Sequence, residues 1–80
     1  MNLKDVLGKD GKADADIMRD YRKAMSLTQS EAAHIIGFTD SRVVRRIEGG
    51  SRGITGPVLS VIKLTMEKKE REERGSYAKK

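Results

Sequence analysis

Three arginines lie within five residues of one another in the segment from Arg42 to Arg46. Arg42 and Arg46 are four positions apart, so both would project from one face of a helix, with Arg45 beside them. A guanidinium group can donate two parallel hydrogen bonds to O6 and N7 of a guanine, and Val43 could contact a thymine methyl group. The pattern is suited to reading base pairs in the major groove of DNA, although Arg45 is equally suited to a phosphate.

The chain offers few of the residue types that catalysis or metal binding requires. It contains no Cys and a single His, which excludes a zinc finger and a site built from several His ligands. Its motifs supply no paired carboxylates, no glycine-rich phosphate loop and no serine with a His and an acid partner. We therefore expect no enzyme activity, no metal, no cofactor and no small-molecule substrate.

The composition indicates one small domain with a charged surface. The chain has 80 residues, of which 36% are hydrophobic, with one Phe and no Trp, and this allows only a modest core. Its 17 Lys and Arg against 12 Asp and Glu give a formal charge of +5, which favours a polyanionic partner. Apolar runs are too short for a membrane span, and the first residues lack the apolar core of a signal peptide. We expect a cytoplasmic protein with no membrane partner.

Four stretches of the chain carry the signals of helices. Residues 14–25 hold apolar side chains at spacings of three and four, as one buried helix face requires. A capping-box pattern and a later glycine predict a second helix within 28–37. A third, short helix over 41–48 has Val and Ile on its inner side and Arg on its outer side, and Pro57 opens a fourth.

No strand-like alternation occurs, so we predict an all-α fold of four to five short helices. Residues 1–13 contain two glycines and little to bury, and we expect a loose arm with one helical turn at 3–7. Residues 14–66 would form the domain. Residues 67–80 would form a charged, solvated extension of the last helix that frays from Gly75.

The run YRKAMSLTQSEAAHIIGF at 21–38, followed by VRRIEGGSRGITGP at 44–57, resembles the Xre family of Cro/CI-like helix-turn-helix regulators. The resemblance covers residues 17–66 and implies a lambda-repressor-like domain. It also implies a sequence-specific transcriptional repressor that binds double-stranded DNA as a homodimer on an inverted repeat and regulates its own phage or plasmid operon. An anti-CRISPR-associated regulator is one specific form of this function.

The resemblance also assigns roles to individual residues. The residues that match Arg22 and Glu48 pair with each other in that family, so we expect a structural ion pair here. The position of Gln29 resembles one that hydrogen-bonds a phosphate, next to free N–H groups at a helix N-terminus. The candidate phosphate-binding residues are Thr28, Gln29, Ser51 and Arg52.

The turn before the third helix is one residue longer than in most members of that family. When the sequence is aligned on the end of this helix, Ser41, Arg42 and Arg46 occupy the positions that usually contact base edges. When it is aligned on Gly37, the contacts shift toward Asp40 and Ser41. We prefer the first alignment because the second would point an arginine at the core.

The helix after Pro57 carries a wide apolar face. Leu59 and Ile62 would cover the core, and the remaining apolar residues would form a dimer interface. Two copies would then read half-sites one helical turn apart, about 34–36 Å. The alternative is that the whole face belongs to the core. The candidate interface residues are Val58, Val61, Thr65 and Met66.

A protein-binding function is the alternative to repression. An antitoxin would neutralise a partner protein and bind DNA only secondarily. Such a protein needs an apolar binding segment, and neither the N-terminal arm nor the charged tail offers much apolar surface. We therefore favour the repressor.

Overall fold

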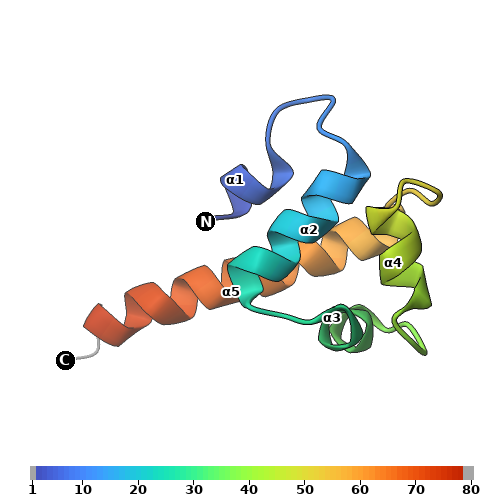
Figure 1. The fold of residues 1–80 in the computed structure, drawn as a ribbon. Helices are drawn as coiled ribbons and strands as arrows, with labels where there is room; N and C mark the ends of the chain where they lie inside the picture. The colour runs from blue at the N-terminus through green and yellow to red at the C-terminus, as the bar shows by residue number, and fades with distance from the viewer. Residues whose placement is uncertain (1, 79–80) are drawn as a thin grey trace.

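The computed structural model describes residues 2–78, with side chains as far as residue 73, and this part of the chain is all-α (Figure 1). No strand occurs in the described residues, as the sequence predicts. Helices over 14–25 and within 28–37 and 41–48 are confirmed to within one residue at each end. The helices are α1 (Leu3–Leu7), α2 (Asp14–Met25), α3 (Gln29–Ile36), α4 (Arg42–Glu48) and α5 (Gly56–Ala78).

The boundaries of α3 follow from its end residues. The Thr28 hydroxyl accepts a hydrogen bond from the Glu31 backbone N–H at 3.0 Å, and the Glu31 carboxylate accepts one from the Thr28 backbone N–H at 2.9 Å. This capping box satisfies two N–H groups that have no partner within the helix. At the other end, Gly37 adopts a φ of 104°, which favours glycine, and it directs the chain into the turn toward α4.

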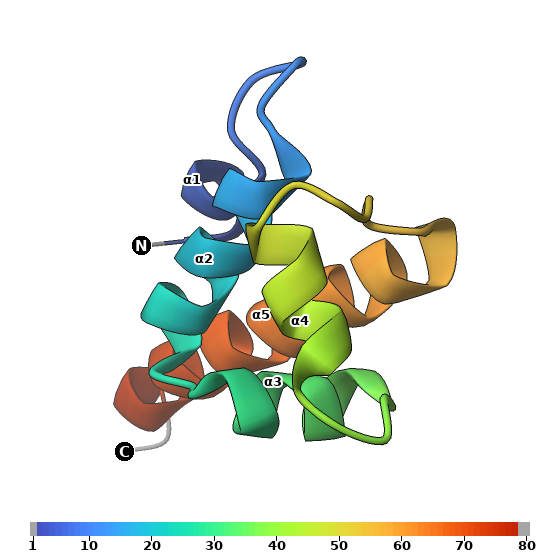
Figure 2. The same cartoon turned by 45° about the vertical axis from the view of Figure 1, so that its right-hand side comes forward.

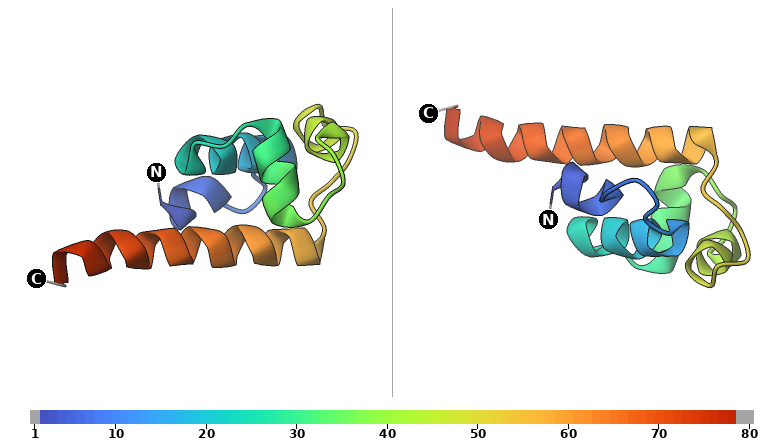
Figure 3. Two further views of the ribbon diagram at one scale, coloured as in Figure 1. Left: turned by 90° about the horizontal axis from the view of Figure 1, so that it is seen from below. Right: turned by 90° about the horizontal axis from the view of Figure 1, so that it is seen from above.

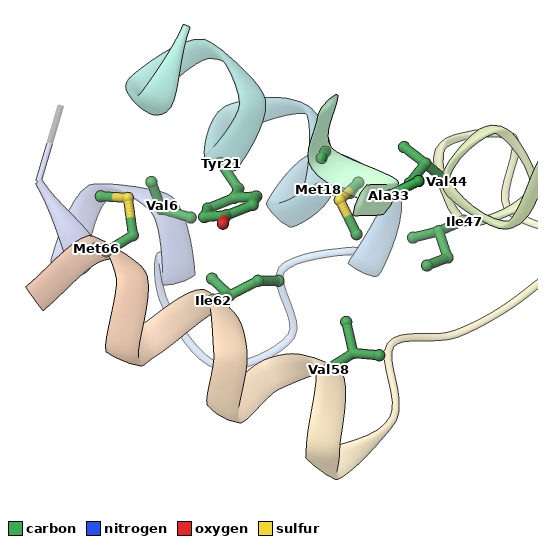
Figure 4. Packing of buried hydrophobic residues seen from close by; sticks show 10 residues of the cluster. Val6, Met18, Tyr21, Ala33, Val44, Ile47, Val58, Ile62 and Met66 are labelled. Carbon is green, nitrogen blue, oxygen red and sulfur yellow. The ribbon is translucent and has the colours of Figure 1, made fainter. Parts of the chain in front are cut away.

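Helix α5 forms one side of the molecule, and the other four helices gather on one face of it, beyond which its C-terminal end extends (Figure 3). Helix α2 contacts α1 and α4, and α3 packs against both α4 and α5. Buried side chains from all five helices meet between α5 and this group (Figure 4). The core residues are Val6, Met18, Tyr21, Ala32, Ala33, Val44, Ile47, Val58, Ile62 and Met66.

The N-terminal segment is not the loose arm that its glycines suggested. Val6 is fully buried, and the Leu3 backbone N–H donates to the Glu70 carboxylate of α5 at 2.7 Å. The Lys12 ammonium group donates to the Val6 carbonyl at 2.8 Å and pairs with Asp20 of α2 at 2.6 Å. These contacts hold α1 on the domain, and the composition of the segment could not reveal them.

Truncation of Val6 tests whether α1 is part of the cooperative fold. We expect Val6→Ala to lower the free energy of unfolding by about 2 kcal/mol, because it removes two buried methyl groups and leaves a cavity. Urea denaturation measures this change. Lys4→Ala, at an exposed position of the same helix, should change the midpoint little. Equal midpoints for the two variants would show that α1 is detached in solution.

The C-terminal segment also differs from expectation, because α5 continues to Ala78 and passes through the region predicted to fray from Gly75. Residues 79 and 80 lie outside the described part of the chain. The charged positions support the extension, since Lys69 and Glu73 pair one helical turn apart at 2.8 Å. None of the described helices is both long and apolar enough to span a membrane.

Candidate nucleic-acid interface

Helix α4 presents its arginines outward because its apolar residues are anchored in the core. Val44 and Ile47 are 0% and 1% exposed, whereas Arg42, Arg45 and Arg46 are all exposed. We call these three side chains the arginine face. The burial of Val44 and Ile47 agrees with the alignment on the end of this helix. Figure 2 shows α4 beside α3 at the front of the molecule, on the surface away from α5.

The three arginines of the arginine face differ in the partners of their side chains. Arg42 is 72% exposed, and its guanidinium group pairs with the Asp40 carboxylate at 3.0 Å. The hydrogen bond with Arg42 lowers the pKa of Asp40, and the same bond raises the pKa of Arg42. Arg45 donates to the Ser41 hydroxyl at 3.3 Å. Within the described residues, the Arg46 side chain has no hydrogen bond or ion pair, so all its donors are available to a ligand.

Val43 and Ser41 lie beside the arginine face and are only partly exposed. Val43 is half-buried and packs against the core, so it is less available to a thymine methyl group than expected. The reason is its angular position, one step around the helix from Arg42 toward the buried Ile47. Ser41 precedes the helix as its N-cap residue and is also half-buried.

An ion pair between Arg22 and Glu48 fixes the position of α4. Arg22 Nε and Nη2 donate to the two Glu48 carboxylate oxygens at 2.6 and 2.9 Å, which is the expected pair in its two-bond form. Gln29 Nε2 of α3 donates to Glu48 Oε1 at 3.2 Å, and Arg19 Nη2 donates to the Glu48 carbonyl at 2.6 Å. Glu48 is only 7% exposed. Helices α2, α3 and α4 therefore share one buried carboxylate.

The Glu48 carboxylate should make stability depend on pH. Burial acts to raise its pKa, but hydrogen bonds from Arg22 and Gln29 and the nearby positive charges outweigh burial, so the pKa lies below its usual 4.5. A carboxylate with a lowered folded-state pKa contributes its stability above the unfolded pKa and loses it as the pH falls through the folded value. We expect the free energy of unfolding to drop as the pH falls below 4.5.

Denaturation of the wild type and of Glu48→Gln across this pH range measures the effect. The glutamine cannot ionise, so the variant should be less stable near neutral pH and should have a flatter pH profile. Asp40 and Glu73 also have lowered pKa values, so both profiles contain their contributions. A variant profile as steep as that of the wild type would show that Glu48 does not contribute.

Three of the four candidate phosphate-binding residues use their side-chain polar groups in contacts within the domain. The Thr28 hydroxyl accepts the capping bond of α3, and Gln29 is half-buried with its amide directed to Glu48. The Ser51 hydroxyl donates to the Arg46 carbonyl at 3.3 Å. Arg52 is exposed, and its guanidinium carbon lies 5.9 Å from the centre of the Phe38 ring. Of the four residues, Arg52 is therefore the one whose side chain is most accessible to a phosphate.

The structure contradicts the predicted dimer interface at two of its four residues. Val58 and Met66 are 7% and 1% exposed and belong to the core, as Figure 4 shows. The Thr65 hydroxyl contacts the Tyr21 hydroxyl at 2.8 Å. The physical reason is that the neighbouring helices cover this side of α5. Val61 and Thr65 are half-buried, and the sequence analysis missed Leu64, an apolar residue of α5 that is 64% exposed.

Two further contacts that position α4 were not found from the sequence. The Arg19 guanidinium group of α2 donates to the carbonyl at the end of α4. The Asp14 carboxylate of α2 accepts the Ile54 backbone N–H at 2.8 Å and holds the loop after α4. The partners lie 29 and 40 residues away in the chain, so no local pattern signals them.

Among the described residues, no group of three or more His, Cys, Asp or Glu side chains is arranged to hold a metal ion. Comparisons of this chain with protein-family models, with curated proteins and with solved structures gave no significant match.

Proposed function

We propose that this protein is a sequence-specific DNA-binding repressor of the lambda-repressor-like, helix-turn-helix type, and that α4 is its recognition helix. The observation that carries the proposal is the arginine face, three exposed arginines on a short helix whose opposite side is buried. The major groove of B-DNA admits an α-helix and displays a distinct donor and acceptor pattern for each base pair. Arginine is the side chain that matches guanine there.

The surroundings of α4 support the same proposal. Helix α3 precedes α4 by a short turn, the Gln29 amide of α3 donates to the Glu48 carboxylate of α4, and the Arg22–Glu48 ion pair joins α4 to α2. Arg52 in the following loop can add a phosphate contact, which would set the register without reading the sequence. The net charge of +5 adds an attraction to DNA that depends on salt.

We further propose that two copies bind together. A single seven-residue recognition helix reads only a few base pairs, and two copies on an inverted repeat double the readout. The exposed Leu64 and the half-buried Val61, three positions apart on α5, are the revised candidates for this contact. Autoregulation follows if the inverted repeat lies in the promoter of the protein's own operon.

The test is binding of the purified protein to the DNA upstream of its own gene and to a scrambled duplex of equal length, across a salt series. We expect two chains per duplex, by mass, and a preference of about a thousandfold or more for the upstream DNA. Equal binding to both duplexes would contradict the proposal. It would leave a basic helical domain with general DNA affinity and would favour an antitoxin-like, protein-binding role.

Leu64 gives a separate test of the dimer. Leu64→Glu introduces a charge at an exposed position, so the monomer should fold normally. We expect the variant to bind the upstream duplex with one chain instead of two, or with lost cooperativity, as measured by native mass spectrometry. Leu64→Met should behave as the wild type. Two chains per duplex for Leu64→Glu would place the dimer contact elsewhere.

A further inference from the structure

The residue before the N-cap of α4 binds Arg42 through both of its carboxylate oxygens. Asp40 Oδ1 accepts the Arg42 backbone N–H at 2.9 Å, and Oδ2 accepts from Arg42 Nη2 at 3.0 Å and from Nε at 3.2 Å. Both side chains are exposed, at 45% and 72%. An exposed ion pair of this kind contributes little to the stability of the fold, so a role for the Asp40–Arg42 pair would lie in binding and not in folding.

The contacts divide the guanidinium group into an occupied edge and a free edge. Arginine has five N–H donors in a planar fork. Asp40 takes the edge formed by Nε and Nη2. The edge formed by Nη1 and Nη2 keeps one outward donor on each nitrogen, and two parallel donors are what O6 and N7 of a guanine accept. The pair therefore leaves Arg42 in a form that can still read a base.

We propose that Asp40 is a specificity-determining residue that acts through Arg42. It holds the guanidinium with its free edge outward, and the fixed orientation favours one guanine over other bases. Its negative charge also repels phosphate oxygens, which weakens binding to DNA where Arg42 finds no guanine. The proposal depends on the proposed function, because Asp40 would select among DNA sequences that α4 already binds.

The experiment compares Asp40→Asn with Asp10→Asn on the upstream duplex and on the scrambled duplex. Both changes raise the net charge by one, and Asp10 is exposed in the loop between α1 and α2. In Asp40→Asn the amide oxygen of the new side chain can still accept the Arg42 backbone N–H, so α4 should keep its start. The unfolding midpoints of the two variants should agree. Equal midpoints would show that any change in DNA binding comes from the orientation of the Arg42 guanidinium group and not from loss of the fold.

We expect Asp40→Asn to bind the scrambled duplex more tightly and the upstream duplex more weakly, so that the preference falls about tenfold. Asp10→Asn should strengthen binding to both duplexes and leave the preference unchanged. Single-base substitutions should show that Asp40→Asn relaxes the same base pair as Arg42→Ala. The double variant should discriminate no worse than Arg42→Ala alone, because Asp40 acts through that side chain.

Three results would overturn the inference. If the wild type has no preference between the duplexes, the proposed function fails and the inference fails with it. If the wild type discriminates and Asp40→Asn discriminates as well as Asp10→Asn, only the role of Asp40 is wrong. If Asp40→Asn increases the preference, Asp40 withdraws Arg42 from the DNA instead of orienting it.

Discussion

Glu48→Ala is expected to lower the free energy of unfolding by about 3 kcal/mol, because it leaves Arg22 partly buried without its partner. The variant loses two short bonds from Arg22 and one from Gln29. The effect should exceed that of an exposed pair, since the Glu48 side chain is only 8% exposed. Urea denaturation near neutral pH measures the change. Glu73→Ala, which removes an exposed partner of Lys69, is the control and should leave the midpoint unchanged.

A double-mutant cycle separates the interaction energy between Arg22 and Glu48 from the effect of losing either side chain alone. Arg22→Ala should also be destabilising, because it leaves the buried Glu48 carboxylate with only Gln29. The double variant should lose less stability than the sum of the single variants, since the partners are in direct contact. Additive losses would show that the two charges do not interact in solution, and would contradict this account of how α4 is held.

Arg46→Ala is expected to weaken binding to the upstream duplex by about ten- to a hundredfold, because one bidentate contact to a guanine accounts for roughly 1–3 kcal/mol of discrimination. Binding to the scrambled duplex should change little by comparison. Arg46 is the sharpest probe of the arginine face, because it has no side-chain partner in the described residues and its removal disturbs no ion pair. Titrations with both duplexes at fixed salt measure the two affinities.

Arg52→Ala is the matched comparison, since it removes the same group from the loop after α4. It should weaken binding to both duplexes evenly and reduce the slope of log affinity against log salt by about 1. If Arg46→Ala and Arg52→Ala lower both affinities in the same proportion, α4 does not read bases. The proposed recognition helix would then be wrong even if the protein binds DNA.

The sequence predicted the helices well because their boundaries depend on neighbouring residues. The Thr28 and Glu31 capping box and the Gly37 terminus each involve contacts within a few positions, so their pattern is visible in the chain. The Arg22 and Glu48 pair is a long-range contact, and it was expected only because two separated motifs resembled a known family. Its two-bond geometry then followed from the packing of α2 against α4.

Contacts that depend on how helices pack could not be predicted in this way. The segment around Val6 looked too polar to pack, but a helix of five residues needs only one buried side chain and a few polar contacts to stay on the domain. The wide apolar face of α5 has several residues that could point inward, and periodicity does not say which of them the neighbouring helices cover. Gln29 likewise turned inward because Glu48 offers it an acceptor.

The position of α5 has a consequence for synthesis of the protein. The Leu3 backbone N–H contacts Glu70, and these residues are separated by 67 positions. The last core residue, Met66, lies at the same end of the chain. On the ribosome, α1 to α4 therefore emerge with an open apolar surface that only α5 can close, and long-range contacts of this kind form late. A nascent chain arrested before α5 should be sensitive to proteases, and a chain from which α5 has emerged should be protected.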